Sequence, residues 1–260
     1  MPQSRPSPLA AAPLRLLLLG GSAEAAVLAK RLAGQPGLAS ILSLAGATRD
    51  PAPQPLLLRV GGWGSAAAQA DWMRREAIGA VIDATHPFAA RIGPRTAAIC
   101  AAAGLPYLRL LRPGWVAGPG DRWTRIPGPE AAAEVIPETA TVLLATGRLS
   151  LPGLSGLAGR RLYCRIVDPP TAAFPYPPGA WLQGRPPFTE AGERRLLRDL
   201  GIDWIVAKDS GGAGGWPKLA AARALDLPVA LIDRPPPPGA SVSTVTEALD
   251  WLARLRGGAP

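Results

Sequence analysis

Histidine, cysteine and lysine are scarce in this sequence of 260 residues. His86 is the single histidine, the two cysteines are Cys100 and Cys164, and lysine occurs only three times. One histidine and two cysteines without a CxxC spacing do not supply the ligands of a tetrahedral zinc site, so no metal site is expected. Both cysteines lie in apolar stretches, and we therefore expect reduced thiols in the core of a cytoplasmic protein.

Long hydrophobic runs are also missing, and no stretch has the length needed to span a bilayer. The apolar run Leu14–Leu19 is short, Arg15 interrupts it, and a glycine pair follows it. These features favour a buried strand over a signal peptide. Residues 1–13 are rich in Pro, Ala and Ser, which predicts a disordered leader. We expect no membrane association.

Acidic side chains are outnumbered by basic ones. The sequence has 28 Lys and Arg and 19 Asp and Glu, which gives a formal net charge of +9. An excess of positive charge favours an anionic partner such as nucleic acid, an anionic surface or an acidic small molecule. The sequence contains no basic run and no basic stretch interleaved with aromatic residues. Nucleic acid is therefore the weaker choice, and an acidic small molecule is favoured.

Short apolar runs alternate with helix-like segments along most of the chain. The expected strands are 14–19, 39–44, 56–60, 81–83, 106–110, 141–145, 162–166, 204–207 and 227–232. This alternation predicts an α/β protein with two Rossmann-like domains, each a doubly wound parallel sheet. The expected domains are residues 14–113 and 123–260, joined by a linker over 114–122 that is rich in glycine and proline.

The first expected strand is followed by a glycine turn and a helix-forming segment, Gly20-Gly21-Ser22-Ala23-Glu24. A strand, a glycine turn and a helix N-terminus together present backbone N–H groups to a phosphate, and the helix dipole favours negative charge there. The full GxGxxG spacing is absent, so a purely structural turn is the alternative.

The next two strands end in groups that suit the adenosine half of a dinucleotide. Ser43 lies at the end of the second strand and Arg49 follows it, and Gly61, Gly62 and Trp63 follow the third strand. An arginine at the end of the second strand accommodates the additional phosphate of NADP, whereas an acid there favours NAD. Arg49 thus favours NADP, and a solvated surface arginine is the alternative.

The strand 81–83 leads directly into Asp83, Thr85 and His86, which we regard as the candidate catalytic groups. Ligands in open α/β sheets bind outside the carboxyl ends of the strands, where this loop is expected. The spacing of apolar residues predicts a helix over 87–103, with Thr85 as its N-cap and Pro87 in its first turn. The alternative is an Asp that fixes the turn and a His that caps the helix.

In the second half, several strands end in a glycine and a cation, as in Gly147-Arg148, Gly184-Arg185 and Lys208 with Ser210-Gly211-Gly212. The planar fork of arginine pairs with carboxylates, so these groups on one sheet edge would suit a ligand with many carboxylates. Because arginine is common throughout the chain, solvated surface residues are the alternative.

Taken in order, these motifs resemble the precorrin-6A reductase family of corrin biosynthesis over about residues 14–255. The segments that carry the resemblance are 19–25 (LGGSAEA), 43–46 (SLAG), 59–64 (RVGGWG), 83–89 (DATHPFA), 111–115 (LRPGW), 146–148 (TGR), 165–170 (RIVDPP), 184–189 (GRPPFT) and 208–212 (KDSGG). The sequence departs from the family at Ala47, where an arginine is frequent, and at Asp209, where an asparagine is frequent.

The resemblance implies an NADPH-dependent reduction of the C18=C19 double bond of precorrin-6A, or of its cobalt form, to precorrin-6B. It also implies a tetrapyrrole polycarboxylate held in the cleft between two Rossmann-like domains of a monomer or weak homodimer. The cofactor residues would be Gly20, Gly21, Ser22, Ala23, Glu24, Ser43, Arg49, Gly61, Gly62 and Trp63. The substrate residues would be Arg91, Thr146, Gly147, Arg148, Arg165, Arg185, Lys208, Ser210, Gly211, Gly212 and Lys218. The proton donor stays open between His86, Asp83 and water.

Two other functions compete with this interpretation. Another NADP-linked small-molecule reductase would need an acid pair such as Tyr and Lys, but the three tyrosines, Tyr107, Tyr163 and Tyr176, lie in no such motif. A non-catalytic basic binding protein would bind nucleic acid with a steep salt dependence. The lack of clustered basic residues argues against it.

Overall fold

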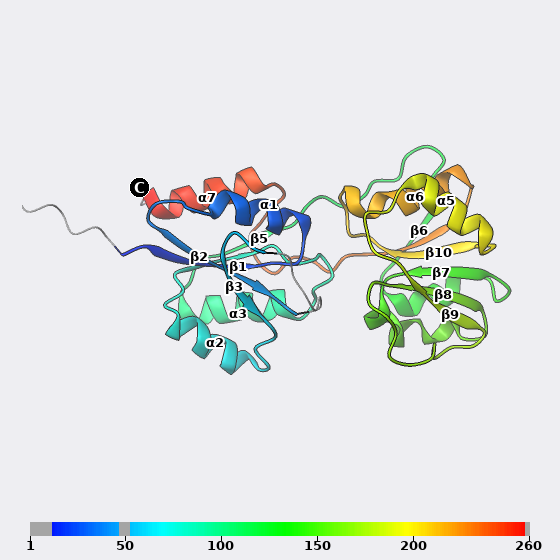
Figure 1. Ribbon diagram of the computed structural model, residues 1–260, viewed down its shortest axis with the longest axis horizontal. Coiled ribbons are helices and arrows are strands. Elements are labelled where there is room, and N and C mark those ends of the chain that lie inside the picture. The colour runs from blue at the N-terminus through cyan, green and yellow to red at the C-terminus, as the bar shows by residue number, and fades with distance from the viewer. Residues whose placement is uncertain (1–11, 47–52, 258–260) are drawn as a thin grey trace, which may run out of the picture. The chain divides into compact units, whose positions relative to one another are not determined.

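The computed structural model describes residues 12–46 and 53–257, which divide into two compact units. Unit 1 comprises Met1–Arg112 and Pro236–Pro260, and unit 2 comprises Pro113–Pro235. Each unit is built around its own six-stranded sheet, in which the paired strands run parallel (Figure 1). The predicted α/β class with two doubly wound parallel sheets is therefore confirmed.

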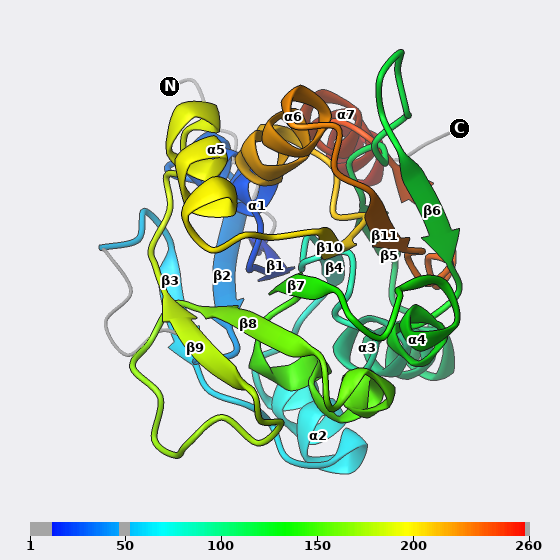
Figure 2. The same cartoon turned by 90° about the vertical axis from the view of Figure 1, so that its right-hand side faces the viewer.

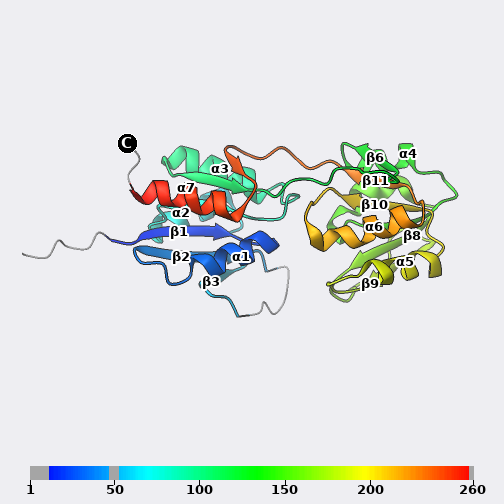
Figure 3. The same ribbon diagram turned by 90° about the horizontal axis from the view of Figure 1, so that it is seen from above.

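The sheet of unit 1 has the strand order β12-β5-β4-β1-β2-β3. Its strands are β1 (Leu14–Leu19), β2 (Leu38–Leu44), β3 (Leu57–Val60), β4 (Ala80–Asp83), β5 (Tyr107–Leu110) and β12 (Ser241–Val242). Its helices are α1 (Ala23–Leu32), α2 (Ala66–Arg75), α3 (Ile92–Ala103) and α7 (Val245–Gly257). Helices α1 and α7 lie side by side on one face, and α2 and α3 cover the other (Figures 1 and 3).

Strand β1 lies in the middle of this sheet, and its sequence explains why. Leu16, Leu17, Leu18 and Leu19 are all buried and pack alternately into the apolar clusters on the two faces. A continuous apolar run is typical of a parallel strand with helices on both sides. Strands β2 and β4 pair with β1 on either side, which brings the carboxyl ends of all three to one edge.

The sheet of unit 2 has the order β6-β11-β10-β7-β8-β9 (Figure 2). Its strands are β6 (Trp123–Ile126), β7 (Thr141–Ala145), β8 (Arg161–Ile166), β9 (Gly179–Gln183), β10 (Trp204–Lys208) and β11 (Val229–Ile232). Its α-helices are α4 (Ala132–Val135), α5 (Glu190–Asp199) and α6 (Trp216–Ala224). Short 3-10 helices span Pro129–Ala131, Arg148–Ser150, Pro152–Leu157 and Ala213–Gly215. Helices α5 and α6 pack together on one face (Figure 1).

The last part of the chain differs from the expected domain boundary of 123–260. Strand β12 pairs with β5, so that Val242 lies opposite Leu110 in the first sheet. Helix α7 places Ala248 and Leu252 in the same apolar cluster as Leu28 of α1. The physical reason is that β5 offers an unpaired edge and α1 an apolar face, and the C-terminal segment covers both.

Helix α3 begins at Ile92 rather than at residue 87, which corrects the predicted start. Thr85 does not cap it, because its backbone N–H and its hydroxyl both bond to Oδ1 of Asp83, at 3.0 and 2.8 Å. The ring Nδ1 of His86 accepts the N–H of Phe88 at 3.2 Å, and the His86 carbonyl accepts the N–H of Ala89. These local bonds hold the segment in turns until Arg91.

Both cysteines are free and buried, as expected from their apolar surroundings. Burial raises the pKa of each thiol, Cys100 and Cys164, to about 11, so neither is a thiolate near neutral pH. Within residues 12–46 and 53–257, no helix has the length and apolar character needed to cross a membrane.

Candidate active site

Most of the predicted cofactor and catalytic residues meet at one edge of the first sheet. Gly20 and Gly21 follow β1, Ser43 lies near the end of β2, and the glycine loop follows β3. Asp83 ends β4, and Thr85 and His86 come after it. They gather there because the strands are parallel, and this is the edge where an open α/β sheet binds its ligands. Arg49 lies outside the described residues.

Ser22 fixes the start of α1 against the loop that follows β4. Its hydroxyl accepts the N–H of Ala25 at 3.1 Å as an N-cap, and it donates to the carbonyl of Ala84 at 2.7 Å. Gly21 has φ of +127°, a backbone conformation that residues with a side chain rarely adopt. The turn therefore presents the N-terminus of α1 at the sheet edge, as a phosphate-binding turn requires.

Glu24, predicted as a cofactor residue, forms an ion pair with Arg112 at 2.6 Å. Burial alone would raise the pKa of Glu24, but its own backbone N–H and the Arg112 guanidinium hold that pKa below the usual value. The carboxylate is thus ionised and paired in the first turn of α1. It fixes Arg112, the last residue before the chain leaves unit 1, and does not itself suit a phosphate.

A pocket of about 320 Å³ opens at this edge of unit 1. Its lining includes seven of the residues predicted from the sequence, namely Gly20, Ser43, Gly61, Gly62, Trp63, Thr85 and Arg91. Arg91 is expected from the sequence to bind the substrate, but it lines this pocket together with the cofactor residues. Arg95, which the sequence does not suggest, also lines it. We call this cavity the unit 1 pocket.

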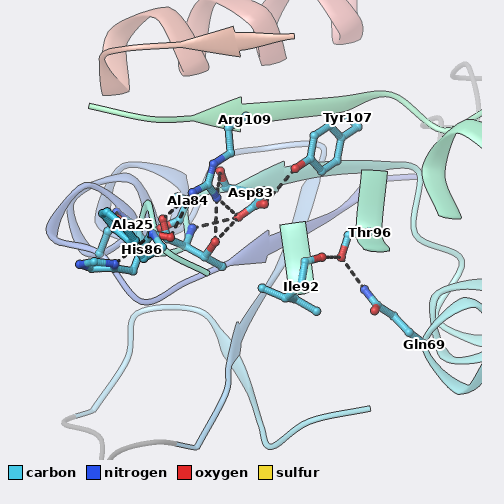
Figure 4. A network of polar contacts seen from close by, with 12 residues as sticks. Ala25, Gln69, Asp83, Ala84, His86, Ile92, Thr96, Tyr107 and Arg109 are labelled. Atoms are coloured by element: carbon cyan, nitrogen blue, oxygen red, sulfur yellow. Dashed lines mark hydrogen bonds and ion pairs between the residues drawn. The ribbon is translucent and has the colours of Figure 1, made fainter. Parts of the chain in front are cut away.

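Asp83 and Arg109 form a buried ion pair in neighbouring strands, where they lie opposite each other in the register of β4 and β5 (Figure 4). Asp83 is fully buried, and both of its carboxylate oxygens have partners. Oδ1 accepts from Arg109 and Thr85, and Oδ2 accepts the Tyr107 hydroxyl at 2.9 Å. Such a carboxylate holds its neighbours in place.

Arg109 connects this network to the candidate catalytic loop, which is the segment after β4 that contains Thr85 and His86. Its Nη2 donates to the carbonyls of Thr85 and His86 at 3.1 and 3.2 Å, and its Nη1 donates to the Thr85 hydroxyl at 2.7 Å. Gly93 at the start of α3 lies so close that a Cβ there would be 2.8 Å from Oδ2 of Asp83. The loop carrying His86 is therefore fixed by a buried charge pair (Figure 4).

The predicted substrate residues of unit 2 likewise follow the carboxyl ends of its strands. Thr146, Gly147 and Arg148 follow β7, Arg185 follows β9, and Lys208 ends β10. The hydroxyl of Thr146 is buried and has no hydrogen-bond partner within the described part of the chain. A buried hydroxyl without a partner is costly, and it marks a position where a ligand oxygen would be bound favourably.

The arginines at this edge differ in how strongly they are bound by other groups of the protein. Arg165 is paired with Glu193 through two bonds of 2.6 and 3.0 Å, and its guanidinium lies 4.5 Å from the centre of the Phe188 ring. Arg185 pairs with Asp168 at 3.1 Å in an exposed contact, and Arg148 donates to the backbone carbonyls of Asp168 and Pro169. Exposed partners exchange easily with a ligand carboxylate, whereas the buried Arg165 pair does not.

The loop after β10 is held in place by Asp209. Its side chain accepts the N–H of Trp115 at 2.9 Å and pairs with Arg125 and Arg234. Gly211 in the same loop has φ of +65°, and a Cβ there would lie 2.1 Å from the carbonyl oxygen of Pro113. The loop thus depends on a close approach to the segment 113–115.

Lys218 lines a cavity of about 130 Å³ together with Arg165 and Glu193. Its Nζ donates to the carbonyl of Gly215 at 2.7 Å and lies 5.3 Å from the centre of the Trp115 ring. Burial, with a smaller contribution from the Arg165 charge, lowers the pKa of Lys218 to about 8, while Glu193 opposes this shift. The ammonium group is therefore easily neutralised.

The lowered pKa of Lys218 predicts a pH-dependent contribution to stability. Between about pH 8 and 10.5 the unfolded chain binds more protons at this residue than the folded protein, so stability rises with pH there, and below pH 8 the full penalty remains. Lys218→Met should gain about 1 to 2 kcal/mol in unfolding free energy at pH 7, a value reduced for partial solvent access, and should lose most of that gain by about pH 10.5. Urea unfolding of both proteins at each pH measures this, and a gain independent of pH would contradict it.

Several residues that shape both edges have no clear signal in the sequence. The sequence places Arg109 at the end of an apolar strand, but it does not show that Arg109 pairs with Asp83. The signal that could have indicated the pair is that a charge within an apolar strand requires a partner, and Asp83 ends another expected strand. Arg59 opens the motif 59–64, but the motif gave it no role of its own, and Arg95 lies in none of the motifs. Glu193 lies on α5, and only the helical spacing that turns it inwards could have indicated that it is buried.

Comparison with known proteins supports one family. The sequence model of the family described as "Precorrin-6x reductase CbiJ/CobK" matches residues 15–253. The chain is 44% identical to precorrin-6A reductase of Rhodobacter capsulatus over 92% of this chain and 96% of the relative, and 40% identical to that of Rhodococcus erythropolis over 93% and 98%. A solved structure described as "CobK precorrin-6A reductase" matches with a TM-score of 0.85 and 43% identity, covering 92% of this chain and 96% of the other.

Proposed function

Because the chain belongs to the precorrin-6x reductase CbiJ/CobK family, we propose that it reduces precorrin-6A to precorrin-6B with NADPH, at the C18=C19 bond, in cobalamin biosynthesis. The observation that carries the proposal is similarity over nearly the whole length of both chains, at 44% identity with one precorrin-6A reductase. A cytoplasmic location and a monomer or weak homodimer stay predictions.

The unit 1 pocket has the donors that a dinucleotide needs. The turn at Gly20 and Gly21 leads into the N-terminus of α1, and the buried indole N–H of Trp63 has no partner within residues 12–46 and 53–257. Backbone amides and a helix N-terminus suit phosphate oxygens, and the indole suits a further acceptor. The chemistry supplied by a bound nicotinamide is hydride transfer, and the residues of the pocket bind and orient that group.

His86 is our proposed proton donor, and Asp83 a positioning residue. The Nδ1 atom of His86 accepts the Phe88 N–H at 3.2 Å, so the neutral ring carries its proton on Nε2. The proton donor would be the imidazolium form, which takes up its second proton from solvent and returns to the neutral ring after donation. Asp83 is fully buried and both of its oxygens accept hydrogen bonds, which supports a positioning role. The Asp83–Arg109 pair instead fixes the carbonyls of Thr85 and His86, and with them the direction of the imidazole.

The carboxylates of the tetrapyrrole are assigned to unit 2. Arg148, Arg185 and Ser210 follow strand ends there, and Lys208 ends β10. Thr146, whose buried hydroxyl has no hydrogen-bond partner among the described residues, lies two positions before Arg148. Arg165 forms a bidentate bond to Glu193, which leaves its guanidinium less able to bind a ligand. We therefore assign it a supporting role in this site and not a direct contact with the substrate. Exposed guanidinium groups that exchange a backbone carbonyl for a carboxylate gain a charge-assisted bond.

The test is a spectroscopic assay of precorrin-6A with the purified full chain and NADPH. We expect consumption of precorrin-6A that requires NADPH and produces a species two hydrogens heavier. If the folded protein binds neither NADPH nor precorrin-6A, the proposal is wrong.

Arg148→Ala should raise KM for precorrin-6A by roughly tenfold with kcat nearly unchanged, because Arg148 is proposed to contribute binding that is equal in the ground and transition states. Arg161→Ala is the matched control, since Arg161 is an exposed arginine at the opposite end of β8 from the proposed site. A fall in kcat at unchanged KM would remove Arg148 from the binding residues.

A further inference from the structure

The loop between β3 and α2, residues 61–64, has its carbonyl groups held by two arginines. Arg59 donates from Nη1 to the carbonyl of Gly61 and from Nη2 to that of Gly62, the latter at 3.1 Å. Arg95 donates from Nη1 to the carbonyl of Gly64 at 3.1 Å. The guanidinium groups thereby fix the orientation of the peptide groups in a loop that contains three glycines.

This arrangement leaves donors of the loop unused. The backbone N–H groups of Gly62, Trp63 and Gly64 donate no hydrogen bond within the described ranges 12–46 and 53–257, and the Trp63 indole N–H is buried without a partner there. All four residues of the loop line the unit 1 pocket. Amides of this kind, flanked by cations, form a concave binding site for an anion.

Arg59 joins this loop to the end of β2. Its Nη1 lies 3.3 Å from the hydroxyl of Ser43, and its guanidinium lies 3.7 Å from the centre of the Trp63 ring. Two of the five guanidinium N–H groups are not used by the bonds to Ser43, Gly61 and Gly62. The residues that directly follow Ser43, namely Leu44, Ala45 and Gly46, include no acid.

The end of β2 is where a dinucleotide fold meets the adenosine ribose, and an arginine there accommodates a 2′-phosphate whereas an acid pairs with a 2′-hydroxyl. We infer that Arg59, with Ser43 and the amides of residues 62–64, binds the 2′-phosphate of NADPH and sets the preference for NADPH over NADH. This inference rests on the proposed function. It assigns to Arg59 the role that the sequence suggested for Arg49.

Calorimetry on the full chain tests this without any turnover. The probes are NADPH and NADH, together with 2′,5′-ADP and 5′-AMP, which differ only by the 2′-phosphate. Arg59→Gln should weaken NADPH and 2′,5′-ADP by about 10- to 100-fold, as expected for loss of a bond between charged groups, and change NADH and 5′-AMP by less than about threefold. Quenching of tryptophan fluorescence by NADPH gives a second readout, because Trp63 lines the pocket.

Arg74→Gln is the matched control, since this exposed arginine of α2 pairs with Asp71 on the same helix. It should leave all four affinities unchanged. An equal loss for NADPH and NADH in Arg59→Gln would mean that Arg59 only shapes the loop, and it would overturn the inference. The inference would also be overturned if Arg49→Gln, and not Arg59→Gln, removed the preference for NADPH over NADH. A wild-type protein that binds neither nucleotide would instead refute the proposed function.

Discussion

Arg109→Gln is expected to lower the free energy of unfolding by about 3 to 5 kcal/mol. The substitution leaves the Asp83 carboxylate fully buried without its cation, and it removes the donors that hold the carbonyls of Thr85 and His86. Breaking a buried pair costs far more than the pair contributes, because the remaining charge has neither water nor a counter-charge. Urea unfolding followed by circular dichroism measures the change.

Two further variants separate the buried charge from general damage. Arg74→Gln breaks an exposed ion pair on α2 and should cost less than about 1 kcal/mol. The double variant Asp83→Asn with Arg109→Gln should be more stable than Arg109→Gln alone, because the unpaired charge is gone. A single Arg109→Gln variant as stable as the Arg74→Gln control would show that Asp83 does not depend on Arg109.

Gly211→Ala should destabilise unit 2 by at least about 3 kcal/mol. The residue has φ of +65°, and an added Cβ would lie 2.1 Å from the carbonyl oxygen of Pro113, a distance that no Cβ tolerates. The contact is with backbone, so no side chain can rotate to relieve it. The loop 208–212 would have to move away from the segment 113–115, which also breaks the bond from Trp115 to Gly212.

Gly214→Ala is the matched control three residues further on. A Cβ added at Gly214 would meet no heavy atom of the surrounding structure within 4 Å, and the φ of this residue is not positive. Its substitution should therefore change stability by less than about 0.5 kcal/mol. Thermal unfolding of the two variants gives the comparison directly. Equal melting temperatures for Gly211→Ala and wild type would contradict the close approach.

The strands were the most predictable part of the fold, for a physical reason. Leu14–Leu19 and Thr141–Ala145 agree with the expected ranges to the residue, because each contains a short apolar run, residues 16–19 and 142–144, that suits a strand buried on both faces. The glycine turns that follow them were also visible. Since parallel strands place such turns at one edge, the approximate location of the candidate site followed from the same pattern.

The features that sequence reasoning missed depend on contacts between distant segments. Strand β12 has only two residues, Ser241 and Val242, and no pattern of its own, so its pairing with β5 could not be predicted. The start of α3 depends on whether Thr85 caps the helix or bonds to Asp83. The local sequence is compatible with both arrangements. Arg59 stands in the motif 59–64, but its bond to Ser43 depends on β2 and β3 lying side by side, which the sequence does not show.

The return of β12 and α7 to the first sheet has a consequence for synthesis on the ribosome. The chain leaves unit 1 at Arg112 and re-enters it at Pro236, so all of unit 2 is translated before unit 1 has its last strand. Until then the outer edge of β5 and the apolar face of α1 stay uncovered. Domains generally fold as they emerge, but here we expect the second unit to complete its sheet before the first.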